Sequence, residues 1–140
     1  MNMDTFFSTI YYYTNGLYCE ELDSYLYETV PGYIHAGLTM IVSSAIFTAI
    51  FYYMLKPVRR QWVSWFVCMG LNALINLFFA LWYTNTPLIN NEIDSSESWT
   101  VLDTFGFGVA NIIWSVIFVH AISLLIKWWS PAKYIPFRKF

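Results

Sequence analysis

The chain has 140 residues, of which 58% are hydrophobic and 11% are charged, whereas about 25% of the residues in a typical soluble domain are charged. So few charges exclude a water-soluble domain of any size and predict an all-α integral membrane protein with three transmembrane helices. The net charge of -2 hides a separation of sign, because basic residues occur only in one short connection and towards the C-terminus, and acidic residues occur elsewhere.

Residues 1–31 are predicted to form an amphipathic segment outside the cytoplasm. They lack the basic start and the apolar core of a secretory signal, so we expect them to remain in the mature protein. A turn at Asn15-Gly16 separates two short helices, and the second, over residues 17–30, has leucines on one face and acidic residues on the other. Such helices either lie at the membrane interface or form an outer cap packed on the bundle or on a neighbour, and the sequence leaves these arrangements open.

Three apolar runs within residues 32–129 predict the transmembrane domain, with spans over residues 33–55, 61–83 and 102–129. As a helix, the first run rises about 35 Å and crosses the roughly 30 Å hydrocarbon core. Tryptophan and tyrosine flank the runs, as in the aromatic belts of membrane proteins. Residues 84–101 form the outer loop, in which Ser95 or Ser96 is the expected N-cap of the third span.

Lysine and arginine set the orientation, because short loops that are rich in them stay in the cytoplasm. The connection between the first two spans is basic, and the tail, residues 130–140, is basic and aromatic. We therefore predict a protein of the cytoplasmic (inner) membrane with its N-terminus outside and its C-terminus inside. The expected topology and lipid anchors are Lys56, Arg59, Arg60, Lys127, Lys133, Arg138 and Lys139.

Uncharged polar residues within the spans occur in pairs four positions apart, so each pair lies on one helix face. Counted from the outer ends of the spans, the pairs fall into two shared layers, about 10–12 Å and 16–18 Å deep. These residues either hydrogen-bond between helices and hold the bundle together, or line a hydrated path. The polar layer consists of Thr39, Ser43, Asn72, Asn76, Asn111 and Ser115.

The third span carries a predicted helix-association face, where small side chains let another backbone come close. Two glycines on this face would be costly in a helix without a packing reason. The helix that packs on this face belongs either to another subunit or to the same chain, which would then form a self-contained three-helix bundle. The face consists of Thr104, Gly106, Gly108 and Ala110.

His35 and Asp103 lie near the outer ends of their spans and are a candidate proton-responsive pair. The alternative is that each side chain reaches interfacial water by itself.

Catalytic motifs are absent from the sequence, which has no metal-ligand spacing, no phosphate-binding glycine loop and no Ser/His/Asp arrangement. We therefore expect no enzymatic activity, no cofactor and no metal site. The expected partners are the lipid bilayer and either further copies of the chain or other membrane subunits, and not nucleic acid.

The leading hypothesis is a homo-oligomeric, cation-conducting pore or channel, because an acidic exterior concentrates cations and the polar layer would face the axis. The alternative is a non-conducting structural or accessory subunit of a larger membrane complex. In outline, the three spans, the outside N-terminus and the basic tail resemble the three-span phage holins, which implies membrane permeabilisation. The long acidic outer segment departs from that family.

Overall fold

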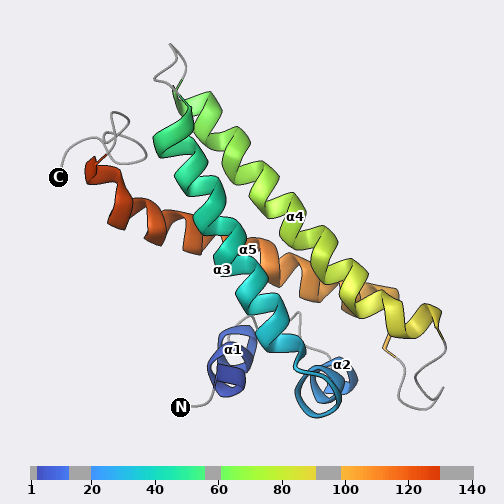
Figure 1. The fold of residues 1–140 in the computed structure, drawn as a ribbon. Coiled ribbons are helices and arrows are strands. Elements are labelled where there is room, and N and C mark those ends of the chain that lie inside the picture. Colours follow the sequence, from blue (N-terminus) through green and yellow to red (C-terminus); the bar gives the residue numbers. More distant parts are fainter. Residues whose placement is uncertain (1–2, 13–19, 56–60, 91–98, 130–140) are drawn as a thin grey trace.

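A computed structural model describes residues 3–12, 20–55, 61–90 and 99–129. Every element assigned within these ranges is helical (Figure 1). The short helices are α1 (Met3–Tyr12), α2 (Glu20–Ser24) and the π-helical turn η1 (Tyr25–Thr29). The long helices are α3 (Gly32–Ala49), α4 (Gln61–Ile89) and α5 (Val101–Ile126). Helix α3 continues into the π-helical segment η2 (Ile50–Met54), and α5 ends in the 3₁₀ turn η3 (Lys127–Trp129).

Three helices are long and apolar enough to cross a membrane, and they comprise Gly32–Met54, Gln61–Ile89 and Val101–Ile126. The predicted all-α class and the three predicted apolar helices are therefore confirmed. The first and third helices lie close to the bounds expected from hydropathy, whereas α4 is longer than expected.

Helix α4 continues beyond residue 83 to Ile89 and takes in the first part of the predicted loop. Pro87 lies inside this last stretch, where a proline normally costs about 3 kcal/mol by removing a backbone hydrogen bond. The Thr86 hydroxyl donates to the Trp82 carbonyl over 2.6 Å, and after the proline the Asn90 amide donates to the Thr86 carbonyl over 3.0 Å, the ordinary i→i−4 bond of a helix. Pro87 is itself buried, so packing keeps the helix intact past the proline.

Helix α5 begins at Val101, and its N-cap is Thr100. The expected cap at Ser95 or Ser96 is therefore wrong. Thr100 and Asp103 form a capping box, in which the Thr100 amide donates to Asp103 Oδ2 over 2.8 Å and the Asp103 amide donates to Thr100 Oγ1 over 3.4 Å. These reciprocal bonds satisfy two backbone donors and fix the start of the helix.

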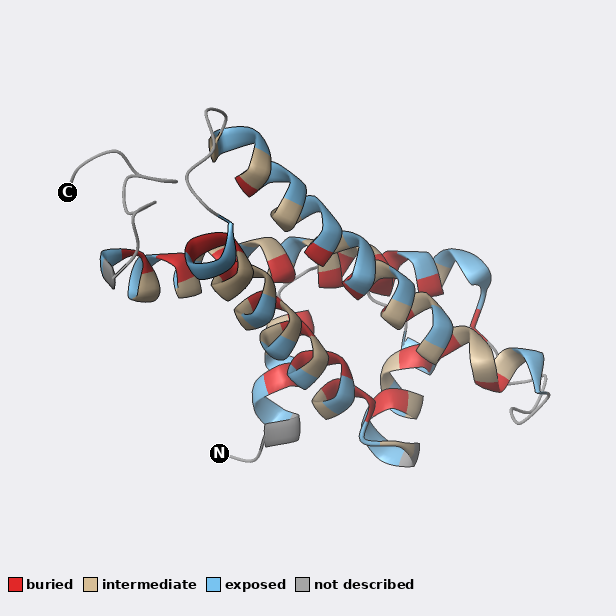
Figure 2. Cartoon of the chain, turned by 45° about the horizontal axis from the view of Figure 1, so that its top comes forward, coloured by how far each residue is buried: buried red, intermediate tan, exposed pale blue. Residues whose placement is uncertain are grey.

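Helix α5 crosses behind α3 and α4 in Figure 1 and packs against both. A Cβ at Gly108 would lie 2.7 Å from Leu77 Cδ1, so only glycine lets α4 and α5 approach this closely without displacing that leucine. Buried residues occupy the faces that the three helices turn towards one another, and exposed residues line the outside (Figure 2).

The N-terminal helices cover one end of the bundle, which we call the capped end (Figure 1). The aromatic ring of Phe7 on α1 packs against Gly37 on α3, where any Cβ would overlap it. Of the arrangements that the sequence left open, the structure has the cap packed on the bundle. The core at this end consists of Phe7, Tyr11, Leu22, Leu26, Tyr33, Ala36, Ala80, Trp99, Phe107 and Ala110.

The opposite end of the bundle has its own, smaller core. It consists of Phe51, Tyr52, Trp65 and Val119. The polar layer lies between these two cores.

Candidate functional site

The predicted polar layer divides into buried and half-buried residues. Asn72, Asn76, Asn111 and Ser115 are at most 2% exposed, and they lie in the interior of a single chain. Thr39 and Ser43 are half-buried and line a shallow groove of about 340 Å³ on α3, together with Leu38, Val42 and Ile46.

The two asparagines of α4 hydrogen-bond to adjacent serines of α3. Asn72 Nδ2 donates to Ser44 Oγ over 3.1 Å, and Asn76 Nδ2 donates to Ser43 Oγ over 2.9 Å. Asn76 Nδ2 also lies 2.8 Å from the Asn72 carbonyl oxygen, within its own helix. Asn72 and Asn76, which are four residues apart on α4, thus contact consecutive residues of the antiparallel helix α3.

Ser44 extends the network to α5, because its hydroxyl donates to the Ser115 carbonyl over 3.4 Å. The Ser115 hydroxyl turns back to the Ile112 carbonyl of its own helix, 2.8 Å away. Ser44 therefore joins the three long helices, although it was missing from the predicted layer. The signal for it was present, since Ser44 and Thr48 are four residues apart on one face of α3.

Asn111 hydrogen-bonds to the N-terminal cap. The Tyr11 hydroxyl of α1 donates to Asn111 Oδ1, and the Tyr11 ring packs against Tyr33 and Phe107. Burial raises the pKa of the Tyr11 phenol, so the phenol stays neutral and keeps its proton for this bond. Asn111 Nδ2 is buried and has no hydrogen-bond partner among the residues that the structure describes.

Tyr11 was not predicted as part of the layer. Its sequence signal is weak, because it lies in a run of three tyrosines that composition alone does not distinguish. Phe7 and Tyr11 are four residues apart and both buried, whereas Tyr12 is exposed, so helical periodicity selects Tyr11 once α1 is known to pack inwards.

The predicted helix-association face is buried within the chain. All four of its residues face the interior of the bundle, and Gly108 contacts Leu77 of α4. This face therefore serves packing inside one three-helix bundle. The residues in question are Thr104, Gly106, Gly108 and Ala110.

His35 and Asp103 form their hydrogen bonds with other residues. His35 Nδ1 lies 3.0 Å from the Tyr83 hydroxyl oxygen, and the two rings meet edge to face. The Asp103 carboxylate accepts from Thr100 in the capping box. The structure thus pairs His35 with the end of α4 and not with the start of α5.

Of the seven predicted anchors, Lys127 alone lies in the part of the chain that the structure describes. Its side chain is buried, and its ammonium group is 5.0 Å from the centre of the Trp128 ring. This is a cation–π contact, and it differs from the exposed lysine expected of a lipid anchor. The others, Lys56, Arg59, Arg60, Lys133, Arg138 and Lys139, lie outside the described residues.

Across residues 3–12, 20–55, 61–90 and 99–129, no group of three or more histidine, cysteine, aspartate or glutamate side chains is placed to hold a metal ion. Comparison of the chain with protein-family models, curated proteins and solved structures gives no match. The arrangement of the polar layer and the cap is thus the basis for any assignment of function.

Proposed function

We propose that this chain is a non-enzymatic integral membrane protein that acts as a non-conducting structural or accessory subunit of a larger membrane complex. The three long helices span the membrane, the capped end lies outside, and the basic connection and tail lie in the cytoplasm. The distribution of lysine and arginine supports this orientation.

The observation that carries the proposal is that most residues of the polar layer form hydrogen bonds inside one chain. Hydrogen bonds link α4 to α3 at two places, α3 to α5 at one and the cap to α5 at one. In a membrane each such bond contributes about 0.6 kcal/mol, and up to about 1.7 kcal/mol. Side chains engaged in this way stabilise a bundle and do not face an axis shared between subunits.

The outward faces of the long helices support the same conclusion, because their large residues are apolar. Such faces suit lipid tails or the apolar spans of neighbouring subunits. An axis formed by them would not replace the hydration shell of an ion. The exposed residues include Leu38, Val42 and Ile46 on α3, Phe66, Leu71, Leu74 and Phe78 on α4, and Phe105, Ile113 and Ile117 on α5.

A cation-conducting homo-oligomer, including a holin-like permeabilising assembly, is the second candidate. The observation that favours it is the buried Asn111 Nδ2 without a partner, because an unsatisfied polar atom in the interior suits contact with water or a passing solute. Conduction by this route requires the Tyr11 side chain to leave Asn111.

The test combines the subunit stoichiometry of the full chain in nanodiscs with ion flux from liposomes. The wild type is compared with Asn76→Leu and with a control, Ile75→Leu, at the adjacent exposed position. We expect no flux from the wild type. Asn76→Leu should lower the free energy of unfolding by about 0.6–2 kcal/mol without changing stoichiometry, and the control should change it by less than about 0.5 kcal/mol.

Wild-type flux that Asn76→Leu alters while the free energy of unfolding is unchanged would overturn the structural role. That result would establish the second candidate and place Asn76 on the conducting path.

A further inference from the structure

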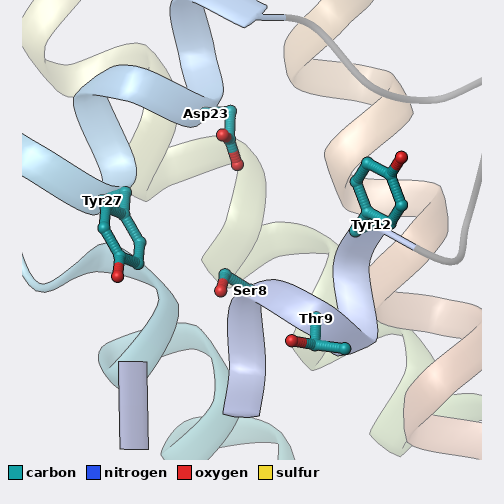
Figure 3. Close-up of a pocket in the computed structure, with 5 residues that line it drawn as sticks. All are labelled: Ser8, Thr9, Tyr12, Asp23 and Tyr27. Atoms are coloured by element: carbon teal, nitrogen blue, oxygen red, sulfur yellow. The ribbon is translucent and has the colours of Figure 1, made fainter. Parts of the chain in front are cut away.

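A second polar site lies in the cap, away from the layer between the long helices. Helices α1 and α2 and the turn η1 enclose a cleft of about 300 Å³ lined by Ser8, Thr9, Tyr12, Asp23 and Tyr27 (Figure 3). In this view Tyr12 and Tyr27 lie on opposite sides of the cleft, with the Asp23 carboxylate and the Ser8 hydroxyl between them. The cleft thus combines two aromatic rings, one carboxylate and two aliphatic hydroxyl groups.

We propose that this cleft binds an organic ammonium group, either a quaternary ammonium or a protonated amine. A cation within about 6 Å of the face of a tyrosine ring is attracted by the ring quadrupole, and a nearby carboxylate adds a direct charge interaction. Rings at the sides and a carboxylate between them suit a cation that is partly apolar.

Asp23 is held in place by the fold. Its Oδ1 accepts a hydrogen bond from the Tyr33 hydroxyl, and Tyr33 is a buried residue of α3. A carboxylate has room for about four hydrogen bonds, and the bond from Tyr33 orients Asp23 in the cleft. Because Tyr33 belongs to the core of the capped end, the carboxylate is fixed to the bundle and not only to its own short helix.

Charge complementarity selects a cation over an anion. The first lysine of the chain is Lys56, and residues 1–55 contain five acidic residues and no lysine or arginine: Asp4, Glu20, Glu21, Asp23 and Glu28. The field in the cap is therefore negative and raises the local concentration of cations.

The donor set selects an organic cation over a metal ion. Among the described residues, the cleft has a single carboxylate, and there is no cluster of metal-ligating side chains, whereas Ca²⁺ takes about 6–8 oxygen ligands. Its volume is at the lower end of clefts that hold small organic molecules, roughly 300–1,000 Å³. Choline and ethanolamine headgroups of lipids and free amines share the chemistry that the cleft fits.

The test is binding of tetramethylammonium to the full chain in phosphatidylglycerol nanodiscs, followed by saturation-transfer NMR of its methyl protons at constant ionic strength. Asp23→Asn removes the charge but keeps an oxygen for the Tyr33 hydroxyl, and we expect it to raise Kd about tenfold or more. Glu28→Gln is the matched control, because it removes an equal charge from an exposed residue outside the cleft, and it should change Kd less than about twofold.

Two substitutions of Tyr27 separate the ring from the hydroxyl. Tyr27→Leu should raise Kd about two- to fivefold, whereas Tyr27→Phe keeps the ring and most of the affinity. Circular dichroism checks that each variant retains its helices.

Repeating the titration in phosphatidylcholine nanodiscs identifies the source of the ligand. Loss of soluble-probe binding there means that a lipid headgroup occupies the cleft, and retained binding means that the site takes a free amine. The proposal is overturned if the wild type shows no saturable binding in phosphatidylglycerol, or if Glu28→Gln weakens binding as much as Asp23→Asn. Neither result bears on whether the protein conducts ions.

Discussion

Ser44→Ala is the sharpest test of how the bundle is held together. The Ser44 hydroxyl accepts from Asn72 over 3.1 Å and donates to the Ser115 carbonyl over 3.4 Å, so the substitution removes one side-chain contact to each neighbouring long helix. It also removes the one hydrogen-bond partner that Asn72 Nδ2 has among the described residues, at a position with 0% exposure. A stranded buried donor costs about 1–3 kcal/mol, and this range is the expected loss in the free energy of unfolding.

Ser43→Ala is the matched control, because Asn76 Nδ2 keeps the Asn72 carbonyl 2.8 Å away. Its expected cost is about 0.6 kcal/mol. The assay is reversible unfolding of the full chain in bicelles, extended to a double-mutant cycle of Ser44→Ala with Asn72→Leu. The two changes should be coupled by about 0.6–1.7 kcal/mol. Equal costs for the two serines, together with coupling below about 0.3 kcal/mol, would refute the role of Ser44.

Two further predictions concern the attachment of the cap. Tyr11→Phe should cost about 1–3 kcal/mol at neutral pH, because neither polar side-chain atom of Asn111 then has a partner among the described residues. Burial raises the pKa of Tyr11 in the folded state, so its contribution is complete below the ordinary value of about 10 and is lost as the pH rises further. In unfolding experiments between pH 8 and 12, the wild type should have the higher free energy of unfolding, and its difference from Tyr11→Phe should shrink by about 1.4 kcal/mol per pH unit above pH 10. A difference that does not change with pH would contradict the buried neutral phenol. Gly37→Ala should push the Phe7 ring away and speed amide hydrogen exchange in α1. The control, Gly70→Ala, adds a Cβ that meets nothing within 4 Å and should not change this exchange. Equal exchange in both variants would contradict the close contact between Phe7 and Gly37.

Features that depend on local sequence were predictable. Hydropathy over a window of about 20 residues gives the three apolar helices, and spacing of four gives the inward faces of Asn72 and Asn76, because both depend only on a residue's near neighbours. The depth match put Asn76 level with Thr39 and Asn72 level with Ser43, whereas Asn76 hydrogen-bonds to Ser43 and Asn72 to Ser44. What the sequence did not decide was which serine each asparagine meets, since consecutive positions on a helix differ by about 100° and both Ser43 and Ser44 are in reach.

Features that depend on pairs distant in the sequence were not predictable. Tyr11 and Asn111 are 100 positions apart, and no pattern within either helix indicates the other. The same applies to His35, whose hydrogen bond with Tyr83 depends on how α3 lies against α4. The π-helical turns η1 and η2 likewise have no accepted sequence signal, so η1 in the cap and η2 at the opposite end depend on tertiary packing.

The position of Tyr11 links the cap to the question of conduction. We expect a hydrated route along the polar layer to pass Asn111, which accepts a hydrogen bond from Tyr11, and the Tyr11 ring packs against Tyr33 and Phe107. Moving it aside would break one buried hydrogen bond and expose rings that bury roughly 150–250 Å² each, at about 25 cal/mol per Å². A conducting state therefore costs several kcal/mol for the cap alone, before any bond between Asn72, Asn76 and α3 is broken. Unless a ligand or a partner favours the undocked cap by a similar amount, the closed bundle dominates, which agrees with the proposed structural role.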